Sequence, residues 1–376
     1  MTINKTLFLS LLLIISLVVS ISVPFTSPTF IRADYRFGDF QGRSPIHIKG
    51  QISTTPQGVT PAQIKKFYNL PSTGGHGTIA IIDVGQNATV ESDLAVFDKQ
   101  FNLPACTTAN KCFEKHIMDT TEKDQGWSLE TAMDVEWAHA IAPGAKILLV
   151  EAKTASGANL MNAVDYARNR SDVVAISMSW GGDEFSDEAT LDSHFTSKYG
   201  ALFFASSGDE GTGPEWPASS PNVIGVGGTH LNITKTGSLS SETAWAGSGG
   251  GISKYETAPA FQISYNLSRA KGKRSIPDVS YNADPDSGFS VYRGGGRPGW
   301  QVVGGTSAGA PQWAAIQSLG LSATHKNLYR DKASPFNYFY FRDIKTGSNG
   351  NCGYYCTTRN DYDYVTGLGS PLTVHF

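Results

Sequence analysis

Short apolar runs alternate with amphipathic stretches along about 250 residues of the chain. Five runs are rich in β-branched residues and end at Gly, Asp or Ser: TIAIIDVG (78–85), AKILLVEA (145–152), VVAISMSWG (173–181), ALFFASSGD (201–209) and VIGVGG (223–228). Stretches between them, such as 128–141, 157–169 and 186–199, have the pattern of helices. Continuous apolar strands that alternate with helices predict an α/β fold, whose mostly parallel central sheet has helices on both faces.

Polar and aromatic residues stand where these strands end. In sheets of this kind, ligands bind at the carboxyl ends of the strands. Asp83, Trp180 and Asp209 occupy such ends and are followed by glycines. We therefore expect the functional groups to gather at this edge of the sheet.

Two segments precede the alternating pattern. Residues 1–23 contain Lys5 and then an apolar run from Leu7 to Val23, which is typical of a secretory signal peptide. An uncleaved membrane anchor is the alternative, although the run is shorter than the ~20 residues that a membrane span needs. Residues 24–56 have little pattern and predict an extended arm or a short pro-segment.

The main domain is predicted to begin at residue 57 and to extend to residue 376. Near its start, TPAQIKKFYNLP has the signals of a short helix. Thr60 would cap this helix and Pro61 would take its first turn, while Ile64, Phe67 and Tyr68 would face inward.

The composition narrows the class of protein. Of the 376 residues, 40% are hydrophobic and 17% are charged, with a net charge of −3 and no run of Lys or Arg. A nucleic-acid partner is therefore not expected.

The four cysteines form two local pairs, Cys106/Cys112 and Cys352/Cys356. Export favours disulfides over metal ligands, although four cysteines allow three pairings. Sequons at Asn87, Asn169, Asn232 and Asn266 would permit glycosylation of an exported chain.

The stretch GGTSAGAP (304–311) has the pattern of a nucleophile turn. Gly304 and Gly305 would allow a sharp bend, and Ser307 would then lie where a helix begins, beside backbone N–H groups that could stabilise an oxyanion. A serine hydroxyl is a poor nucleophile unless a base takes its proton. The sequence must therefore supply a base.

The histidines are poor candidates for that base, and a pair of acids is a better one. His76 lies in a Gly-rich turn before the first strand, and His139 lies on a helix beside Trp137. On the same helix Glu130 and Asp134 are four residues apart, so their carboxyl groups share a face. A solvated acidic face is the alternative. A central strand follows this helix, however, and a buried pair of acids would share a proton.

At this point the chain resembles the sedolisin family, the serine-carboxyl peptidases, which have a subtilisin-like fold and act in acid. The matching stretches occur in the family's order: TPAQIKKFYNLP, ETAMD with APGA after it, SSGDEG, GGTSAGAP, and FRDI with YDYVTGLGSP. They cover residues 57–376. The resemblance implies that Ser307 is the nucleophile, Glu130 its base and Asp134 the partner that orients Glu130.

The resemblance also assigns roles to the residues at the strand ends. Asp209 would be a protonated carboxyl that donates a hydrogen bond to the oxyanion, and Asp83 would support the proton network behind the two acids. Trp180 would lie in the substrate cleft, with ordinary core packing as the alternative. Gly181 and Gly182 would pair through their backbone with an extended peptide.

The same resemblance implies one calcium site near the C-terminus. Asp343 and Asp363 would provide carboxylates, and Ile344, Arg359 and Asp361 would provide backbone carbonyls, a donor set that suits this hard cation. The family usually has Gly where Arg359 and Asp361 stand. Asp361 could therefore add a third carboxylate, whereas Arg359 would repel the ion unless it points outward.

The sequence thus predicts a secreted, monomeric peptidase that acts on proteins or peptides in acid. Sedolisins generally carry a long pro-domain, and residues 24–56 are too few to form one, so either the domain folds unaided or the arm provides a reduced pro-segment. Two other functions remain possible. One is a subtilisin-type Ser–His–Asp peptidase that uses Asp83, and the other is an inactive binding module. Internal cleavage and removal of tripeptides are both open.

Overall fold

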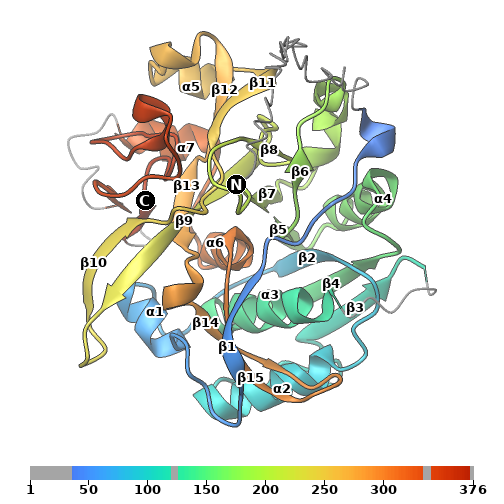
Figure 1. The fold of residues 1–376 in the computed structure, drawn as a ribbon. Helices are drawn as coiled ribbons and strands as arrows, with labels where there is room; N and C mark the ends of the chain where they lie inside the picture. The colour runs from blue at the N-terminus through green and yellow to red at the C-terminus, as the bar shows by residue number, and fades with distance from the viewer. Residues whose placement is uncertain (1–35, 120–125, 333–339, 373–376) are drawn as a thin grey trace, which may run out of the picture. The chain divides into compact units, whose positions relative to one another are not determined.

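The centre of the fold is an eight-stranded sheet (Figure 1). The computed structural model describes residues 36–119, 126–332 and 340–372, which belong to one unit, Asp34–Phe376. In spatial order the strands are β10 (Leu239–Ala244), β9 (Val223–Ile233), β7 (Leu202–Ser206), β5 (Val173–Met178), β2 (Thr78–Val84), β4 (Lys146–Ala152) and β3 (Phe113–Ile117), and β13 (Val279–Asn282) also pairs with β9. The pairings are parallel except that of β10 with β9. The predicted mostly parallel sheet is confirmed.

Helices cover both faces of the sheet. Successive side chains of a strand point to opposite sides, so each face forms a core of its own with the helices that cover it. Ile79 and Ile81 of β2 join a core with α2 (Val90–Phe101), α3 (Ser128–Ile141) and α6 (Gly309–Ser318). Ala80 and Ile82 join a second core with α4 (Gly157–Arg168). Continuous burial of β2 on both faces explains why its sequence is apolar throughout.

The predicted helices form with one change of type. In α1 (Pro61–Phe67) Thr60 caps the first turn, accepting from the Gln63 backbone N–H, and Tyr68 is buried just after the helix. The stretch predicted as a helix at 186–199 is instead a 3-10 helix, η2 (Glu188–Phe195). Short helices elsewhere are η1 (Phe37–Asp39), α5 (Ala260–Ser264), η3 (Ser268–Ala270), η4 (Pro285–Ser287), η5 (Thr306–Ala308), α7 (His325–Lys332) and η7 (Gly353–Cys356).

Smaller sheets surround the central one. A three-stranded sheet contains β1 (His47–Ser53), β15 (Gly299–Gly304) and β14 (Phe289–Arg293). Two-stranded pairs are β11 (Gly251–Thr257) with β12 (Lys273–Ile276), β6 (Gly182–Asp183) with β8 (Glu215–Trp216), and β16 (Phe341–Arg342) with β17 (Ser370–Pro371). Strand β1 belongs to the predicted N-terminal arm, so this part of the arm is built into the fold.

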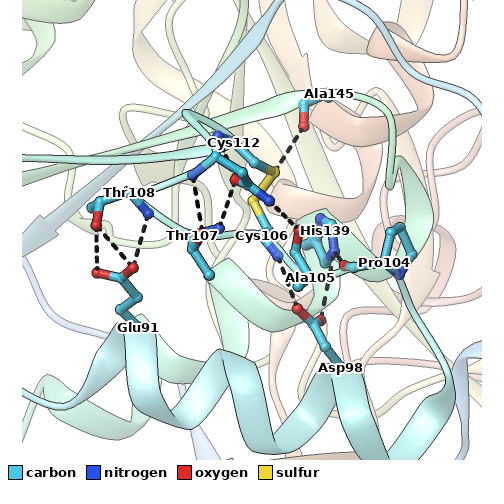
Figure 2. Close-up of a disulfide and its surroundings, with 11 residues drawn as sticks. Glu91, Asp98, Pro104, Ala105, Cys106, Thr107, Thr108, Cys112, His139 and Ala145 are labelled. Atoms are coloured by element: carbon cyan, nitrogen blue, oxygen red, sulfur yellow. Dashed lines mark hydrogen bonds and ion pairs between the residues drawn. A yellow bond between two sulfur atoms is a disulfide. The ribbon is translucent and has the colours of Figure 1, made fainter.

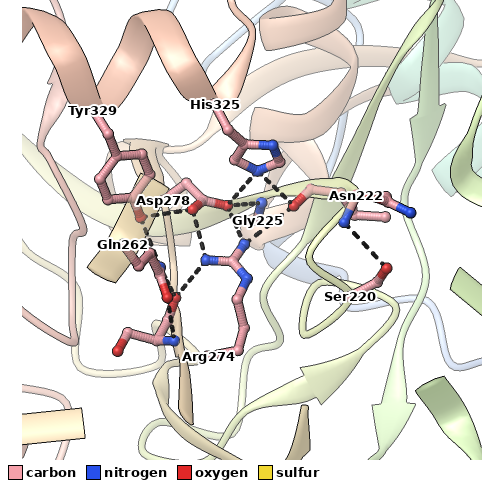
Figure 3. A network of polar contacts seen from close by, with 10 residues as sticks. Ser220, Asn222, Gly225, Gln262, Arg274, Asp278, His325 and Tyr329 are labelled. Atoms are coloured by element: carbon pink, nitrogen blue, oxygen red, sulfur yellow. Dashed lines mark hydrogen bonds and ion pairs between the residues drawn. The ribbon is translucent and has the colours of Figure 1, made fainter. Parts of the chain in front are cut away.

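A buried ion pair links β12 and the turn before β13 to β9 (Figure 3). Two nitrogens of Arg274 contact the two carboxylate oxygens of Asp278 at 2.8 and 2.5 Å, and both side chains are fully buried. Gly225 N–H and the Tyr329 hydroxyl also donate to Asp278. Burial alone would raise the pKa of Asp278, but the charges of Arg274 and His325 hold it below its usual range. The pair therefore stays ionised in mild acid.

Both cysteine pairs form the local disulfides, Cys106–Cys112 and Cys352–Cys356. One predicted sequon is unsuitable for glycosylation in the folded chain. Asn87 is buried and its amide donates to the Ser128 carbonyl. In the described part of the chain, every helix is too short or too polar to cross a membrane. The predicted signal peptide lies outside the described residues.

Candidate active site

The predicted nucleophile lies on a sharp turn between a strand and a helix. β15 ends at Gly304, Gly305 has φ = 125°, and Ser307 follows in η5 just before α6. A side chain at Gly305 would bring its Cβ within 2.1 Å of the Pro45 carbonyl oxygen, so only glycine fits. Ser307 is buried, and its hydroxyl lies 3.4 Å from the Ser179 carbonyl oxygen.

The two acids of α3 meet the nucleophile inside the protein. Glu130 and Asp134 are fully buried, which excludes the alternative of a solvated acidic face. Burial has the largest effect on the pKa of the Glu130 carboxyl and raises it, whereas Ser44, Asp134 and Ser307 lie close enough to oppose that rise. Asp134 lies close to Glu130 and to Ser179, and neither of its carboxyl oxygens has a hydrogen-bond partner among the described residues. Ser307, Glu130 and Asp134 are thus neighbours inside the protein.

Burial controls the protonation of the acids in the site. It raises the pKa of Glu130 and of Asp134 well above their usual ranges, and the charge of Asp83 raises both further. Asp83 stands near the end of β2, where burial raises its pKa to about 7. Three buried carboxyl groups this close to one another cannot all ionise, so they share protons. Asp83 has the neighbours that its predicted supporting role requires.

Asp209 faces the nucleophile turn from the loop after β7. Its Oδ1 accepts hydrogen bonds from the Thr306 backbone N–H at 2.8 Å and from the Thr306 hydroxyl at 2.7 Å. Its Oδ2 lies 3.1 Å from His47 Nε2. Burial raises the pKa of Asp209, against these hydrogen bonds. Because Thr306 donates to Oδ1, a proton on this carboxyl would be carried by Oδ2.

The N-terminal arm passes directly through this site, which the sequence did not predict. The Ser44 hydroxyl donates a short hydrogen bond to Glu130 Oε2. Arg43 exchanges two backbone hydrogen bonds with Gly181, at 2.9 and 3.1 Å, and Gly42 N–H donates to the Ala155 carbonyl at 2.7 Å. The arm is therefore an extended strand between the loops that follow β4 and β5. These long-range contacts have no local signal in an arm of little pattern.

The residues predicted for the substrate cleft divide into two groups. Gly181 pairs with an extended segment, as expected, but that segment is the chain's own arm. Gly182 pairs with Trp216 across β6 and β8. The Trp180 side chain is fully buried, and its indole N–H donates to the Ile82 carbonyl at 3.1 Å. The prediction that this side chain lines the cleft was wrong, and core packing is correct.

The predicted calcium ligands come from two segments, residues 343–344 after β16 and residues 359–363 after η7. Asp343 accepts from the Asp361 backbone N–H, and Asp363 from that of Arg359. The guanidinium of Arg359 lies over the Tyr354 ring, 4.0 Å from its centre. The ring face stabilises the positive charge of Arg359 through a cation–π interaction. Asp363 also accepts from the backbone N–H groups of Val365 and Thr366, and Lys345 Nζ lies 3.7 Å from Asp343 Oδ2. Both carboxylates therefore have partners within the protein, Ile344 is buried, and calcium binding here stays a prediction.

A third carboxylate at that site is not supported. Within the described residues, the one group of three His, Cys, Asp or Glu side chains close enough to share an ion is Cys106, Cys112 and His139. Its two cysteines are joined in a disulfide, so this group is not a metal site.

Comparisons with known proteins show the family to which the chain belongs. Residues 117–335 match the subtilase family. Sedolisin of Pseudomonas sp. (strain 101) is 28% identical over 84% of this chain and 60% of that protein, and kumamolisin of Bacillus sp. (strain MN-32) is 30% identical over 93% and 67%. Tripeptidyl-peptidase 1 of Dictyostelium discoideum is 28% identical over 83% and 57%. The chain therefore spans about three fifths of the length of these relatives.

Solved structures show the same likeness. Pseudomonas sedolisin, a serine-carboxyl proteinase complexed with two molecules of pseudo-iodotyrostatin, superposes with a TM-score of 0.71 at 28% identity, over 84% of this chain and 96% of that one. Sphericase, at 21% identity and a TM-score of 0.54, shares the fold.

Proposed function

The chain belongs to the sedolisin family of the subtilases, and from this membership we propose that it hydrolyses peptide bonds of proteins or peptides in acid. The observation that carries the proposal is the burial of Glu130 and Asp134 together beside Ser307. The subtilisin-type alternative lacks equivalent support. His47 is the histidine beside the site, and it contacts Asp209 and the Trp245 ring.

The residues can perform acyl transfer in two steps. In the molecules whose Glu130 is ionised, Ser307 Oγ attacks the carbonyl carbon while Glu130 takes the hydroxyl proton, and Asp134 holds the Glu130 carboxyl in place. Asp209, protonated at Oδ2, donates a hydrogen bond to the oxyanion that forms. Glu130 returns its proton to the leaving amine as the C–N bond breaks. A water molecule then attacks the acyl-enzyme with Glu130 again as the base, which releases the acid and restores Ser307.

We propose internal cleavage rather than removal of tripeptides. The arm runs through the site without interruption, from Gln41 at the loop after β4 to β1, which pairs with β15. β15, the strand that ends at the nucleophile turn, is therefore also paired with a part of the arm. A site that holds a continuous chain on both sides of Ser307 suits a long substrate.

Calcium and secretion complete the proposal. Carboxylates of Asp343 and Asp363, with carbonyls of Ile344, Arg359 and Asp361, would hold one Ca²⁺. The ion would neutralise the two carboxylates and stabilise the C-terminal loop. Two disulfides support an oxidising compartment and hence export. We also propose that the protein is a monomer.

Digestion of an acid-denatured protein by the purified full chain tests the function. We expect hydrolysis at pH 3 to 4, abolished by Ser307→Ala. Activity at neutral or alkaline pH that is lost on substitution of a histidine would support the subtilisin-type alternative. A lack of hydrolysis at every pH would support the inactive binding module.

A further inference from the structure

The loop that carries Asp209 is held by other segments of the chain. It comprises residues 207–213, which follow β7. Four backbone hydrogen bonds of 2.7 to 3.1 Å join it to residues 247–250, which precede β11. Near the nucleophile, Gly208 N–H donates to the Thr306 hydroxyl at 3.2 Å. The last part of the loop lies against a hairpin from the C-terminal part of the chain.

This hairpin comprises residues 347–358 and contains the disulfide Cys352–Cys356. The Thr212 backbone N–H donates to the Asn349 carbonyl at 3.0 Å, and Thr212 Oγ1 lies 3.7 Å from Cys352 Sγ. A Cβ at Gly211 would lie 2.6 Å from the same Asn349 oxygen. The hairpin and the loop are therefore packed backbone against backbone, with no room for a side chain at Gly211.

Asn349 links the hairpin to both of the other segments. It is buried, and its side-chain Nδ2 donates to the Ser248 carbonyl at 2.7 Å. Its backbone N–H donates to the Cys356 carbonyl at 3.0 Å, within the hairpin. Asn349 thus holds Thr212 through its carbonyl and Ser248 through its amide, while the disulfide-bonded part of the hairpin supports Asn349 itself.

We propose that Asn349 is a positioning residue for hydrolysis, which keeps the loop 207–213 in the conformation that aims Asp209 at the oxyanion, and that the disulfide Cys352–Cys356 keeps Asn349 in place. The inference rests on the proposed peptidase function and adds these residues to it. A hydrogen-bond donor stabilises an oxyanion best when it is already in position before the reaction. Asp209 is three residues from Thr212, so a shift of the hairpin reaches it through the backbone.

The first test is the kinetics of Asn349→Ala in the full chain, with a long unstructured peptide as substrate at pH 4. We expect kcat to fall about tenfold, because a misplaced donor loses part of what a missing one would lose. KM should change little, because Asp209 acts on the transition state. Asn349→Asp should restore most of the turnover at this pH, because a buried carboxyl is protonated there and can donate to the Ser248 carbonyl.

The pH profile separates positioning from a general loss of stability. Burial raises the pKa of Asp209, and a loosened loop would expose this carboxyl to water. Its pKa should then fall towards the usual value, so Asp209 loses the proton that it donates at a lower pH. The upper limit of the kcat profile should therefore move to lower pH in Asn349→Ala.

Charges elsewhere do not explain such a shift. His47 of the arm and Glu215 of β8 are charged neighbours of Asp209, and neither is altered in these variants. Residues 347–358 and 247–250 contain no Asp, Glu, His, Lys or Arg. The hairpin can therefore act on Asp209 through position and burial, but not through a charge of its own.

The two disulfides provide a matched pair of variants, which also test the inference if Asn349→Ala fails to fold. Cys352→Ser with Cys356→Ser should lower kcat and move the pH limit as Asn349→Ala does. Cys106→Ser with Cys112→Ser removes a disulfide of similar span between α2 and β3, and should lower Tm while kcat and the pH limit keep their wild-type values. All assays are made well below the lowest Tm.

Two results would overturn the inference while the wild type still cleaves the peptide. One is an unchanged kcat and pH limit after loss of the Cys352–Cys356 disulfide. The other is an equal fall of kcat in both disulfide variants, which would show a general effect of stability. The absence of cleavage by the wild type would instead contradict the proposed function, and the inference with it.

Discussion

Asp98 offers a direct test of whether buried carboxyl groups make this fold more stable in acid (Figure 2). It lies on α2, and its Oδ2 accepts a hydrogen bond from the Cys106 backbone N–H at 3.2 Å. His139 Nε2 lies 3.5 Å from Oδ1 and is also 2.8 Å from the Pro104 carbonyl oxygen. Burial lowers the pKa of His139, so this ring is neutral near pH 7. Near pH 7, Asp98 therefore faces a neutral imidazole, which cannot stabilise its charge as a cation would.

The size of the effect follows from proton linkage. Burial raises the pKa of Asp98 from 3.8 to about 7. Between these two values the folded state holds a proton that the unfolded state has released, so the free energy of unfolding falls as the pH rises. Each pKa unit corresponds to about 1.4 kcal/mol. The ionisation of Asp98 therefore costs at most about 4 kcal/mol between pH 4 and pH 7.

Asp98→Asn removes this cost, because the amide cannot ionise and its oxygen can still accept from Cys106. We expect the variant to be more stable than wild type at pH 7 by roughly 1–3 kcal/mol, and equally stable at pH 4. Urea denaturation at both pH values measures the difference. An equal loss of stability at pH 4 and pH 7 would refute the reasoning, since it would show that the amide merely disrupts the local packing.

Asp172→Asn is the matched control. Its hydrogen bond with Arg170 lowers the pKa of Asp172 to about 2. A lowered pKa contributes stability that is present above the unfolded value of 3.8 and is lost only as the pH falls through about 2. The pair is partly exposed, so the variant should lose less than about 1 kcal/mol. This loss should be nearly the same at pH 4 and pH 7.

The remaining predictions concern catalysis and calcium. Ser307→Ala and Glu130→Gln should each lower kcat/KM by about 10⁴-fold or more, and the double variant should lose little beyond either one, because the residues act as a unit; additive losses in steady-state assays would contradict this. Asp209→Asn should cost about 10²–10³-fold in kcat, and the remaining activity should persist to higher pH because the amide donor does not titrate; a profile that falls at the wild-type pH would exclude Asp209 as the limiting group. Chelation of calcium should lower Tm in wild type, and Asp343→Ala should mimic it and abolish the response to chelator; an unchanged Tm in both experiments would mean that the site binds no ion.

Much of the fold could be predicted because its signals are local. β2 is apolar on both faces, and it lies between two cores that bury alternate side chains. In α1, Thr60 and Pro61 show the start of the helix within a few residues. The acids of α3 could be placed together because a spacing of four residues determines a shared face. That geometry needs no knowledge of the rest of the chain.

The residues that the sequence did not identify depend on distant partners. Ser44 and Glu130 are 86 positions apart, and Arg43 is 172 positions from Glu215, with which it forms an ion pair. β6 and β8, which carry Asp183 and Glu215, the two partners of Arg43, are two residues each, too short for a periodic pattern. Trp180 was misplaced for a related reason. A tryptophan at a strand end fits a cleft or a core equally well until its neighbours are known.

The arm and the catalytic groups are controlled by the same protons. His47 and Asp209 attract each other as an ion pair only while Asp209 is ionised, and this contact raises the pKa of His47. Asp209 must be protonated to donate to an oxyanion, so the state that suits catalysis is also the state in which the arm loses this attraction. Glu215 behaves in the same way towards Arg43, because its protonation in acid removes the charge that attracts the guanidinium. Acid therefore weakens two of the arm's contacts as it prepares the oxyanion donor.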